Sequence, residues 1–102
     1  MDAAIAAISH PARRHLLVLV RDRERRPSDL AEAVGLTRPA TSQHLRVLRD
    51  AGLVAVRSRG GHRYYRAEEE RLEALRGFLE DFWLGRISAL RQAAELGEES
   101  AP

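Results

Sequence analysis

The amino-acid sequence predicts a single, mainly helical domain that carries one small β-hairpin, and three features predict it. Between residues 2 and 52, apolar residues recur at three- and four-residue spacing and are interrupted by proline and glycine, which is typical of short helices. Residues 53–67 change to extended runs on either side of a glycine pair, which is typical of a hairpin. Residues 68–96 return to helical spacing over a longer stretch. The predicted order is therefore four short helices, two strands and one long helix.

The composition is that of an ordinary globular domain with an unusual choice of basic residue. Of the 102 residues, 44% are hydrophobic and 31% charged, and we expect one domain over residues 1–96 with a disordered tail at 97–102. The formal net charge is only +2, and all 17 basic residues are arginine. Arginine makes planar, two-pronged hydrogen bonds to phosphate or guanine, which suits DNA. The alternative is a GC-rich genome that favours arginine codons, so the distribution of the arginines has to decide.

Several classes of protein are excluded by what the sequence lacks. The absence of cysteine excludes disulfides and thiolate metal sites. No apolar run approaches the ~18 residues of a membrane-spanning helix, and no signal peptide is recognisable, so we expect a cytoplasmic protein. Ser42 and His44 are two apart on a predicted helix, which points them in different directions, and no phosphate-binding or dinucleotide-binding glycine motif is present. We therefore expect neither an enzyme nor a cofactor.

Two helices are predicted at the start of the chain. Residues 2–8 form a short alanine-rich helix that is apolar almost all round, so it needs cover on every side. Pro11 suits the first turn of the next helix, with Ser9 or His10 as its cap. A run of charged residues follows at 21–26. We interpret that run as a solvated helix end and loop; a phosphate contact from Arg25 or Arg26 is the alternative.

Two further short helices form a helix-turn-helix pattern. Pro27 opens the first of them, and Gly35 closes it. Thr37 or Arg38 can cap the second, and Gly52 supplies its left-handed end. Two short helices joined by a tight turn are typical of DNA-binding proteins. Such corners also occur in proteins that never touch DNA, so the exposed face of the second helix matters.

The second helix of this pair, residues 37–52, has two contrasting faces. Helical spacing turns Thr41, Leu45 and Leu48 inward. The outward side carries Pro39, Ser42, Gln43 and Arg46, with Arg38 at the start and Arg49 at the flank. Outward arginine, serine and glutamine side chains can hydrogen-bond base edges and phosphates. We interpret this stretch as a recognition helix in the major groove; a solvated surface helix is the alternative.

The hairpin that follows has a basic tip. The pair Gly60-Gly61 predicts a two-residue turn. Arg57, Arg59 and Arg63 cluster toward this tip, and apolar residues lie toward the base. A hairpin rooted in the core with a basic tip is a wing that can reach phosphates or the minor groove. A plain hairpin kept soluble by edge arginines is the competing interpretation, but the position directly after a helix-turn-helix favours the wing.

The last predicted helix, residues 68–96, carries an apolar stripe that spans roughly half its circumference, more than one packing surface needs. Gly77 and Gly85 are candidate breaks in it. Because a monomer would leave the apolar stripe exposed to water, we infer a homodimer in which the first and last helices pair across a two-fold axis. The residues expected at this interface are Ile5, Ile8, Leu72, Leu79, Phe82, Trp83, Ile87 and Leu90. The alternatives are burial within the chain or a ligand pocket beside Phe78 and Trp83.

Five segments of the chain match motifs that occur together in one family. They are ISHPARR at 8–14, DLA at 29–31, TSQHLRVLR at 41–49, AGLV at 51–54, and the hairpin positions Gly60, Tyr65 and Arg66. With the basic wing and the long last helix, they resemble the ArsR/SmtB family of bacterial winged-helix repressors. The resemblance covers about residues 2–95. It implies an obligate homodimer, joined through its first and last helices, that represses transcription by binding an imperfect palindrome near a promoter.

The resemblance also implies which residues contact double-stranded DNA. In the family the recognition helix makes the base contacts, and the wing contacts DNA beside it. The matching positions are Arg38, Ser42, Gln43 and Arg46 on the helix, and Arg57, Arg59 and Arg63 on the wing. To these we add Thr37, Pro39 and His44, which flank the helix face. For His44 we expect either a local hydrogen bond or a phosphate contact.

The chain departs from the family in the parts that sense metals. Many members bind a metal through cysteines in the helix before the recognition helix, or through Asp, Glu and His on the last helix. Here residues 27–35 contain neither Cys nor His, and the last helix has no His, so we expect no metal site. Asp81-Phe82-Trp83 resembles a branch with an aromatic pair and no known metal ligands. Two alternatives stay open: a switch with a small-molecule or metal effector near the last helix, and a protein-interaction module that does not bind DNA.

Overall fold

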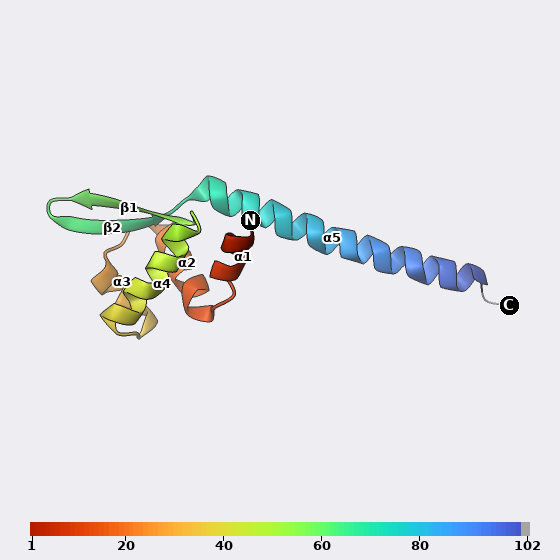
Figure 1. Ribbon diagram of the computed structural model, residues 1–102, viewed down its shortest axis with the longest axis horizontal. Coiled ribbons are helices and arrows are strands. Elements are labelled where there is room, and N and C mark those ends of the chain that lie inside the picture. The colour runs from red at the N-terminus through yellow and green to blue at the C-terminus, as the bar shows by residue number, and fades with distance from the viewer. Residues whose placement is uncertain (101–102) are drawn as a thin grey trace.

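The computed structural model describes residues 1–100, apart from the side chains of residues 86–88 and 98–100. In chain order its elements are α1 (Asp2–Ala7), α2 (Pro11–Asp22), α3 (Pro27–Val34), α4 (Arg38–Asp50), β1 (Val54–Arg59), β2 (His62–Ala67) and α5 (Glu69–Ser100) (Figure 1). This is the predicted order of four short helices, two strands and a long helix. The predicted fold class is confirmed.

The core lies where α1, α2, α3 and α4 meet the base of the hairpin and the first turns of α5. Leucine side chains from each of α2, α3 and α4 are fully buried there, and burial of apolar surface is the main force that holds such a domain together. The residues predicted to face inward from α4, Thr41, Leu45 and Leu48, are all buried, and α2 buries Leu16, Leu17 and Val20 beside them. The buried Thr41 hydroxyl is satisfied, because it donates to the Thr37 carbonyl at 2.9 Å.

Local chemistry fixes the ends of both helices in the helix-turn-helix. Gly35 ends α3 at φ +69°, a left-handed conformation that glycine adopts without strain. The Thr37 hydroxyl oxygen accepts a hydrogen bond from the Ala40 N–H at 3.3 Å, so Thr37 rather than its neighbour caps α4. At the other end Gly52 takes φ +79°, and the N–H groups of Gly52 and Leu53 bond back to the last turn of α4.

The hairpin turns at Gly60 and Gly61, whose φ angles of +58° and +77° are those a two-residue turn requires. One feature of this region was not predicted. Arg25 forms an antiparallel bridge with Tyr65, with N–H to carbonyl distances of 2.9 and 2.8 Å. The connection between α2 and α3, which we expected to be a solvated loop, is therefore fixed along the free edge of β2.

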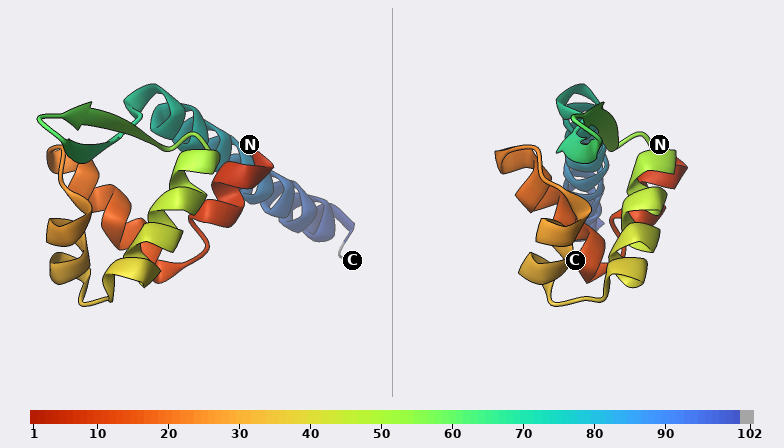
Figure 2. Two further views of the ribbon diagram at one scale, coloured as in Figure 1. Left: turned by 60° about the vertical axis from the view of Figure 1, so that its left-hand side comes forward. Right: turned by 90° about the vertical axis from the view of Figure 1, so that its left-hand side faces the viewer.

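Helix α5 projects from the rest of the molecule, which gives overall dimensions of 73 × 25 × 21 Å (Figures 1 and 2). Its beginning reaches the core through Leu72 and Leu75. The helix runs unbroken through both glycines that we considered as breaks. It also continues through Ser100, so it ends later than we expected; residues 101–102 of the expected tail lie outside the described residues.

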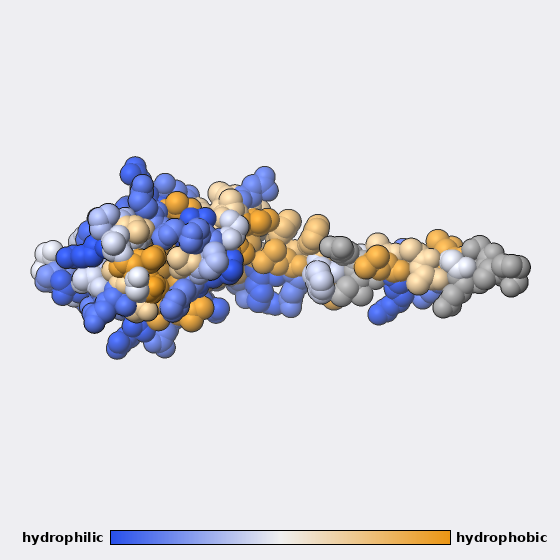
Figure 3. Space-filling view, turned by 90° about the horizontal axis from the view of Figure 1, so that it is seen from below, coloured by the Kyte–Doolittle hydropathy of each residue, from blue (hydrophilic) through white to orange (hydrophobic). Residues whose placement is uncertain are grey.

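The projecting part of α5 exposes large apolar side chains (Figure 3). They are Phe78, Leu79, Phe82, Trp83, Leu84, Leu90 and Leu96, of which Phe82 is 63% exposed and Trp83 58%. The other side chains expected at the dimer interface, those of Ile5, Ile8 and Leu72, are half-buried within the single chain. Ile87 lies outside the described side chains. The apolar stripe is therefore not covered by this chain itself, which removes burial within the chain as an alternative for the exposed residues.

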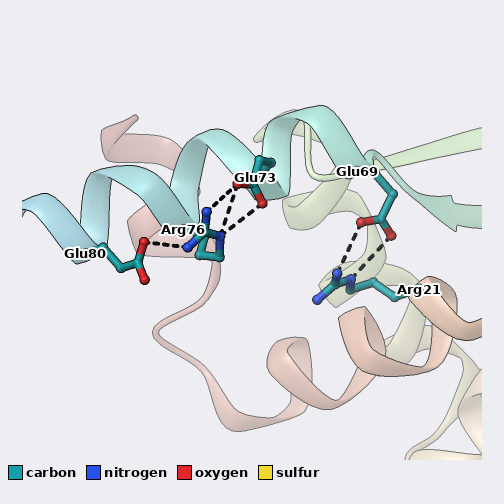
Figure 4. A network of polar contacts seen from close by, with 5 residues as sticks. All are labelled: Arg21, Glu69, Glu73, Arg76 and Glu80. Atoms are coloured by element: carbon teal, nitrogen blue, oxygen red, sulfur yellow. Dashed lines mark hydrogen bonds and ion pairs between the residues drawn. The ribbon is translucent and has the colours of Figure 1, made fainter.

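Ion pairs line one flank of α5 and tie its first turn to α2 (Figure 4). Arg21 of α2 donates to the two oxygens of the Glu69 carboxylate at 3.3 and 3.2 Å. Farther along, Arg76 pairs with Glu73 and Glu80 and lowers the pKa of the Glu73 carboxyl. Exposed ion pairs of this kind contribute little to stability. They mark a polar side of the helix, next to the apolar stripe.

Candidate nucleic-acid interface

A hollow of about 680 Å³ opens between α4 and the hairpin. It is lined by Pro27, Ser42, Gln43, Arg46, Arg49, Asp50, Arg63 and Tyr65. Three arginines against one aspartate give the hollow an excess of positive charge. A concave, polar and positively charged surface attracts an anionic partner such as a phosphate backbone.

Helix α4 supplies the side chains on one wall of the hollow. Ser42 and Arg46 are four residues apart and Gln43 lies beside Ser42, so one helix face carries all three. Their side chains are exposed. Among the side chains that the structure describes, no carboxylate lies within ion-pair distance of Arg46 or Arg49. The expected contact residues Thr37, Arg38 and Pro39 are exposed in the first turn of this helix and at its cap, beyond the lining of the hollow.

The hairpin divides the three predicted wing arginines between its two faces. Residues that pair directly in an antiparallel ladder lie on the same face. Arg63 pairs with Ser58 on the face of the buried Tyr65, and its guanidinium carbon lies 5.7 Å from the Tyr65 ring centre. Arg57 and Arg59 occupy the alternate positions of β1, so they lie on the opposite face. Neither of them lines the hollow.

Arg57 and Arg59 instead approach Glu24, a residue that the sequence did not single out. The N–O distances are 3.2 Å from Arg57 and 3.0 Å from Arg59. The structure therefore brings Arg46 and Arg63 together and sets Arg57 and Arg59 apart. The two faces follow from the two-residue turn, which pairs residue 58 with 63 and so fixes the alternation. No sequence pattern indicates the pairing of Glu24 with these arginines, because this pairing depends on the bridge between Arg25 and Tyr65, which was not predicted.

His44 lies on another side of α4, toward α2. Its ring centre is 4.5 Å from that of His10, and its Nδ1 is 3.3 Å from Arg13 Nη1. Because a guanidinium only donates hydrogen bonds, this contact requires an unprotonated Nδ1. Partial burial, followed by the positive charges of His10 and Arg13, lowers the pKa of His44. His44 thus makes a local contact within the protein and does not line the hollow.

Acidification is expected to destabilise the fold through His44. Since its pKa is lowered from an ordinary value of 6.5, the folded state favours the neutral ring. The contribution of the neutral His44 ring to stability is complete above the pKa of this residue in the unfolded chain. It is lost as the pH falls from there through the lower pKa of the folded state. Denaturant titrations above pH 6.5 and below the lowered pKa of His44 give the free energy of unfolding at both ends of this loss. Its drop on acidification should be smaller for His44→Gln than for the wild type. Equal drops would contradict the assignment.

A second hollow, of about 380 Å³, runs along the exposed side of α5. It is lined by Arg76, Leu79, Glu80, Trp83 and Leu84, and Phe78 is not part of it. Since a single helix bounds it, it is a surface groove. Among the described side chains, no group of three His, Asp or Glu residues could hold a metal ion. Within the residues that the structure describes, none of the helices combines the length and the hydrophobicity of a membrane-spanning segment.

Comparison with known proteins identifies the family. Residues 10–56 match the family described as "Bacterial regulatory protein, arsR family". The HTH-type transcriptional regulator Rv2034 of Mycobacterium tuberculosis is 34% identical over 91 residues, which cover 89% of this chain and 85% of that protein. The transcriptional repressor SdpR of Bacillus subtilis is 32% identical over 65 residues, which cover 64% of this chain and 72% of that one.

A solved structure shows the same architecture. The homodimeric winged helix-turn-helix DNA-binding domain Mb0332 of Mycobacterium bovis matches with a TM-score of 0.67 and 31% identity, over 83% of this chain and 82% of that one. The family match, the relatives and the fold therefore agree. This chain belongs to the ArsR family of bacterial regulatory proteins, the winged helix-turn-helix transcriptional regulators.

Proposed function

We propose that the protein is a homodimeric repressor of transcription that acts in the cytoplasm on a palindromic DNA operator. The observation that carries this proposal is the positively charged hollow between α4 and the hairpin, where Arg46 and Arg63 lie without a carboxylate partner among the described side chains. A family relative is named as a repressor, and another is homodimeric. A bound dimer would block access of the transcription machinery to the promoter.

The exposed face of α4 would read the operator in the major groove. Gln43 can pair with adenine and Arg46 with guanine, since both side chains form two parallel hydrogen bonds to these bases. Ser42 and Arg38 lie on the same helix face and extend the contact along the groove. Arg49 and Arg63, which also line the hollow, would bind phosphates and fix the position of the helix.

The exposed stripe of α5 would form the dimer interface together with α1. Phe82 and Trp83 remain more than half exposed in the single chain, although large aromatic side chains favour burial. Pairing with a second copy across a two-fold axis would bury both stripes. The same axis would duplicate the recognition helix, so that the two copies face successive major grooves.

Selection of bound fragments from the organism's genome, beginning with the promoter of the protein's own gene, tests the proposal. We expect enrichment of a symmetric site whose two half-sites lie about one helical turn apart, some 34 Å. Nuclease protection of the enriched site should show two protected grooves on one face of the duplex. Failure to enrich any DNA at low salt would reject DNA binding and favour a protein-interaction module.

A further inference from the structure

We propose that Glu24 restrains the wing and so increases the selectivity of the protein for its operator. It would do so by competing with phosphates for Arg57 and Arg59, which weakens binding to DNA of arbitrary sequence. The inference rests on the proposed function as a DNA-binding repressor. It assigns a specificity-determining role to a residue outside both the recognition helix and the hairpin.

Both oxygens of the Glu24 carboxylate are paired with arginines. Oε2 lies 3.2 Å from Arg57 Nη2, and Oε1 lies 3.0 Å from Arg59 Nη1, so each oxygen serves one guanidinium. The Glu24 side chain is only 24% exposed, whereas the two arginine side chains are 57% and 58% exposed. The carboxylate is therefore seated against the protein, while the arginines remain accessible to a phosphate that competes for them.

The backbone beside Glu24 keeps the carboxylate in place. The neighbouring Arg25 is bonded to Tyr65 in both directions across the free edge of β2, and its own guanidinium donates to the Leu19 carbonyl at 3.0 Å. Arg59 has a second contact, since its guanidinium carbon lies 4.5 Å from the centre of the Tyr64 ring. The bonds of Arg25 thus fix the backbone next to Glu24 beside the wing, within reach of both arginines.

The arrangement separates two sets of arginines by their partners. Arg46, Arg49 and Arg63 lie at the hollow with no carboxylate in ion-pair distance among the described side chains, whereas Arg57 and Arg59 share one carboxylate. The three charged groups at Glu24 together carry one positive charge instead of two. Binding to arbitrary DNA depends on how many phosphates the protein neutralises, so this pairing lowers non-specific affinity more than it lowers affinity that comes from base contacts. Because both arginine side chains are more than half exposed, these pairs add little to folding stability, which leaves the control of charge as the main effect.

The variant Glu24→Gln tests the inference, because it keeps the size of the side chain and removes its charge. We expect several-fold tighter binding to a duplex of arbitrary sequence and a smaller ratio of operator to non-operator affinity. The plot of log affinity against log salt should become steeper by about 0.9 for each extra phosphate neutralised. Glu95→Gln on the distal part of α5 is the matched control, with the same charge change far from the hollow.

Adding Arg57→Ala and Arg59→Ala to Glu24→Gln should abolish the gain and the steeper slope. Should Glu24→Gln fail to fold by circular dichroism, Glu24→Ala serves in the same comparison. An unchanged slope, or a gain that survives loss of both arginines, would overturn the inference while leaving operator binding by the wild type intact. A wild-type protein that binds no DNA would instead reject the proposed function itself.

Discussion

Replacing Phe82 and Trp83 together by alanine is expected to dissociate the dimer into single chains of 11.5 kDa. Both side chains are more than half exposed in the single chain, and a two-fold interface contains each of them twice. Removal of a buried Phe or Trp side chain costs about 3–5 kcal/mol, so the double variant should lose most of the dimerisation free energy. Sedimentation velocity over a range of protein concentrations measures the loss directly.

Asp81→Ala is the control for this experiment, because it changes a neighbouring exposed residue that the helical spacing places away from the apolar stripe. This variant should sediment like the wild type. Weaker operator binding is expected to accompany dissociation in the double variant, since one protomer contacts only one half-site. A wild-type chain that sediments as a monomer would contradict the dimer.

Replacing Arg46 by alanine is expected to weaken operator binding by roughly 1–3 kcal/mol for each half-site. The guanidinium is exposed at the hollow and has no ion-pair partner among the described side chains, so its loss should leave the free energy of unfolding nearly unchanged. Gln43→Ala should weaken binding by a similar amount without altering the salt dependence, because an uncharged side chain neutralises no phosphate. Fluorescence anisotropy with labelled operator at several salt concentrations measures both effects.

Arg91→Ala provides the matched control for Arg46→Ala, since it removes the same charge from an exposed position on α5. It should bind the operator like the wild type. Retention of full affinity by both Arg46→Ala and Gln43→Ala would contradict the assignment of this helix face to DNA.

Local sequence signals predicted the elements whose ends are set by local chemistry. The prolines at the starts of α2 and α3, the glycine after α3 and the threonine cap of α4 each act within a turn of the residue concerned. The turn at Gly60 and Gly61 belongs to the same class. Helix α5 departs from this rule, because glycine is tolerated in helix interiors at a modest cost. Its bounds therefore could not be predicted from its glycines.

The candidate site was only partly predictable, since it combines segments that are distant in the sequence. The outward face of α4 follows from helical spacing, and its residues lie where the spacing predicts. The contact of His44 with Arg13 depends on how α2 packs against α4, and the pairing of Glu24 with the wing depends on how the connection after α2 lies along β2. No periodicity within a single element encodes such contacts.

Because α5 extends far beyond the core of its own chain, dimerisation is coupled to the folding of its distal turns. An isolated helix is marginal in water unless its apolar face is packed, and the distal turns of α5 find no packing partner in their own chain among the described residues. In a monomer, the helical conformation of those turns is therefore only weakly stabilised. Helical content measured by far-ultraviolet circular dichroism should consequently rise with concentration, in step with association. Proteases would also cleave the unfolded distal turns of a monomer readily. Subunits that fail to dimerise would therefore be degraded.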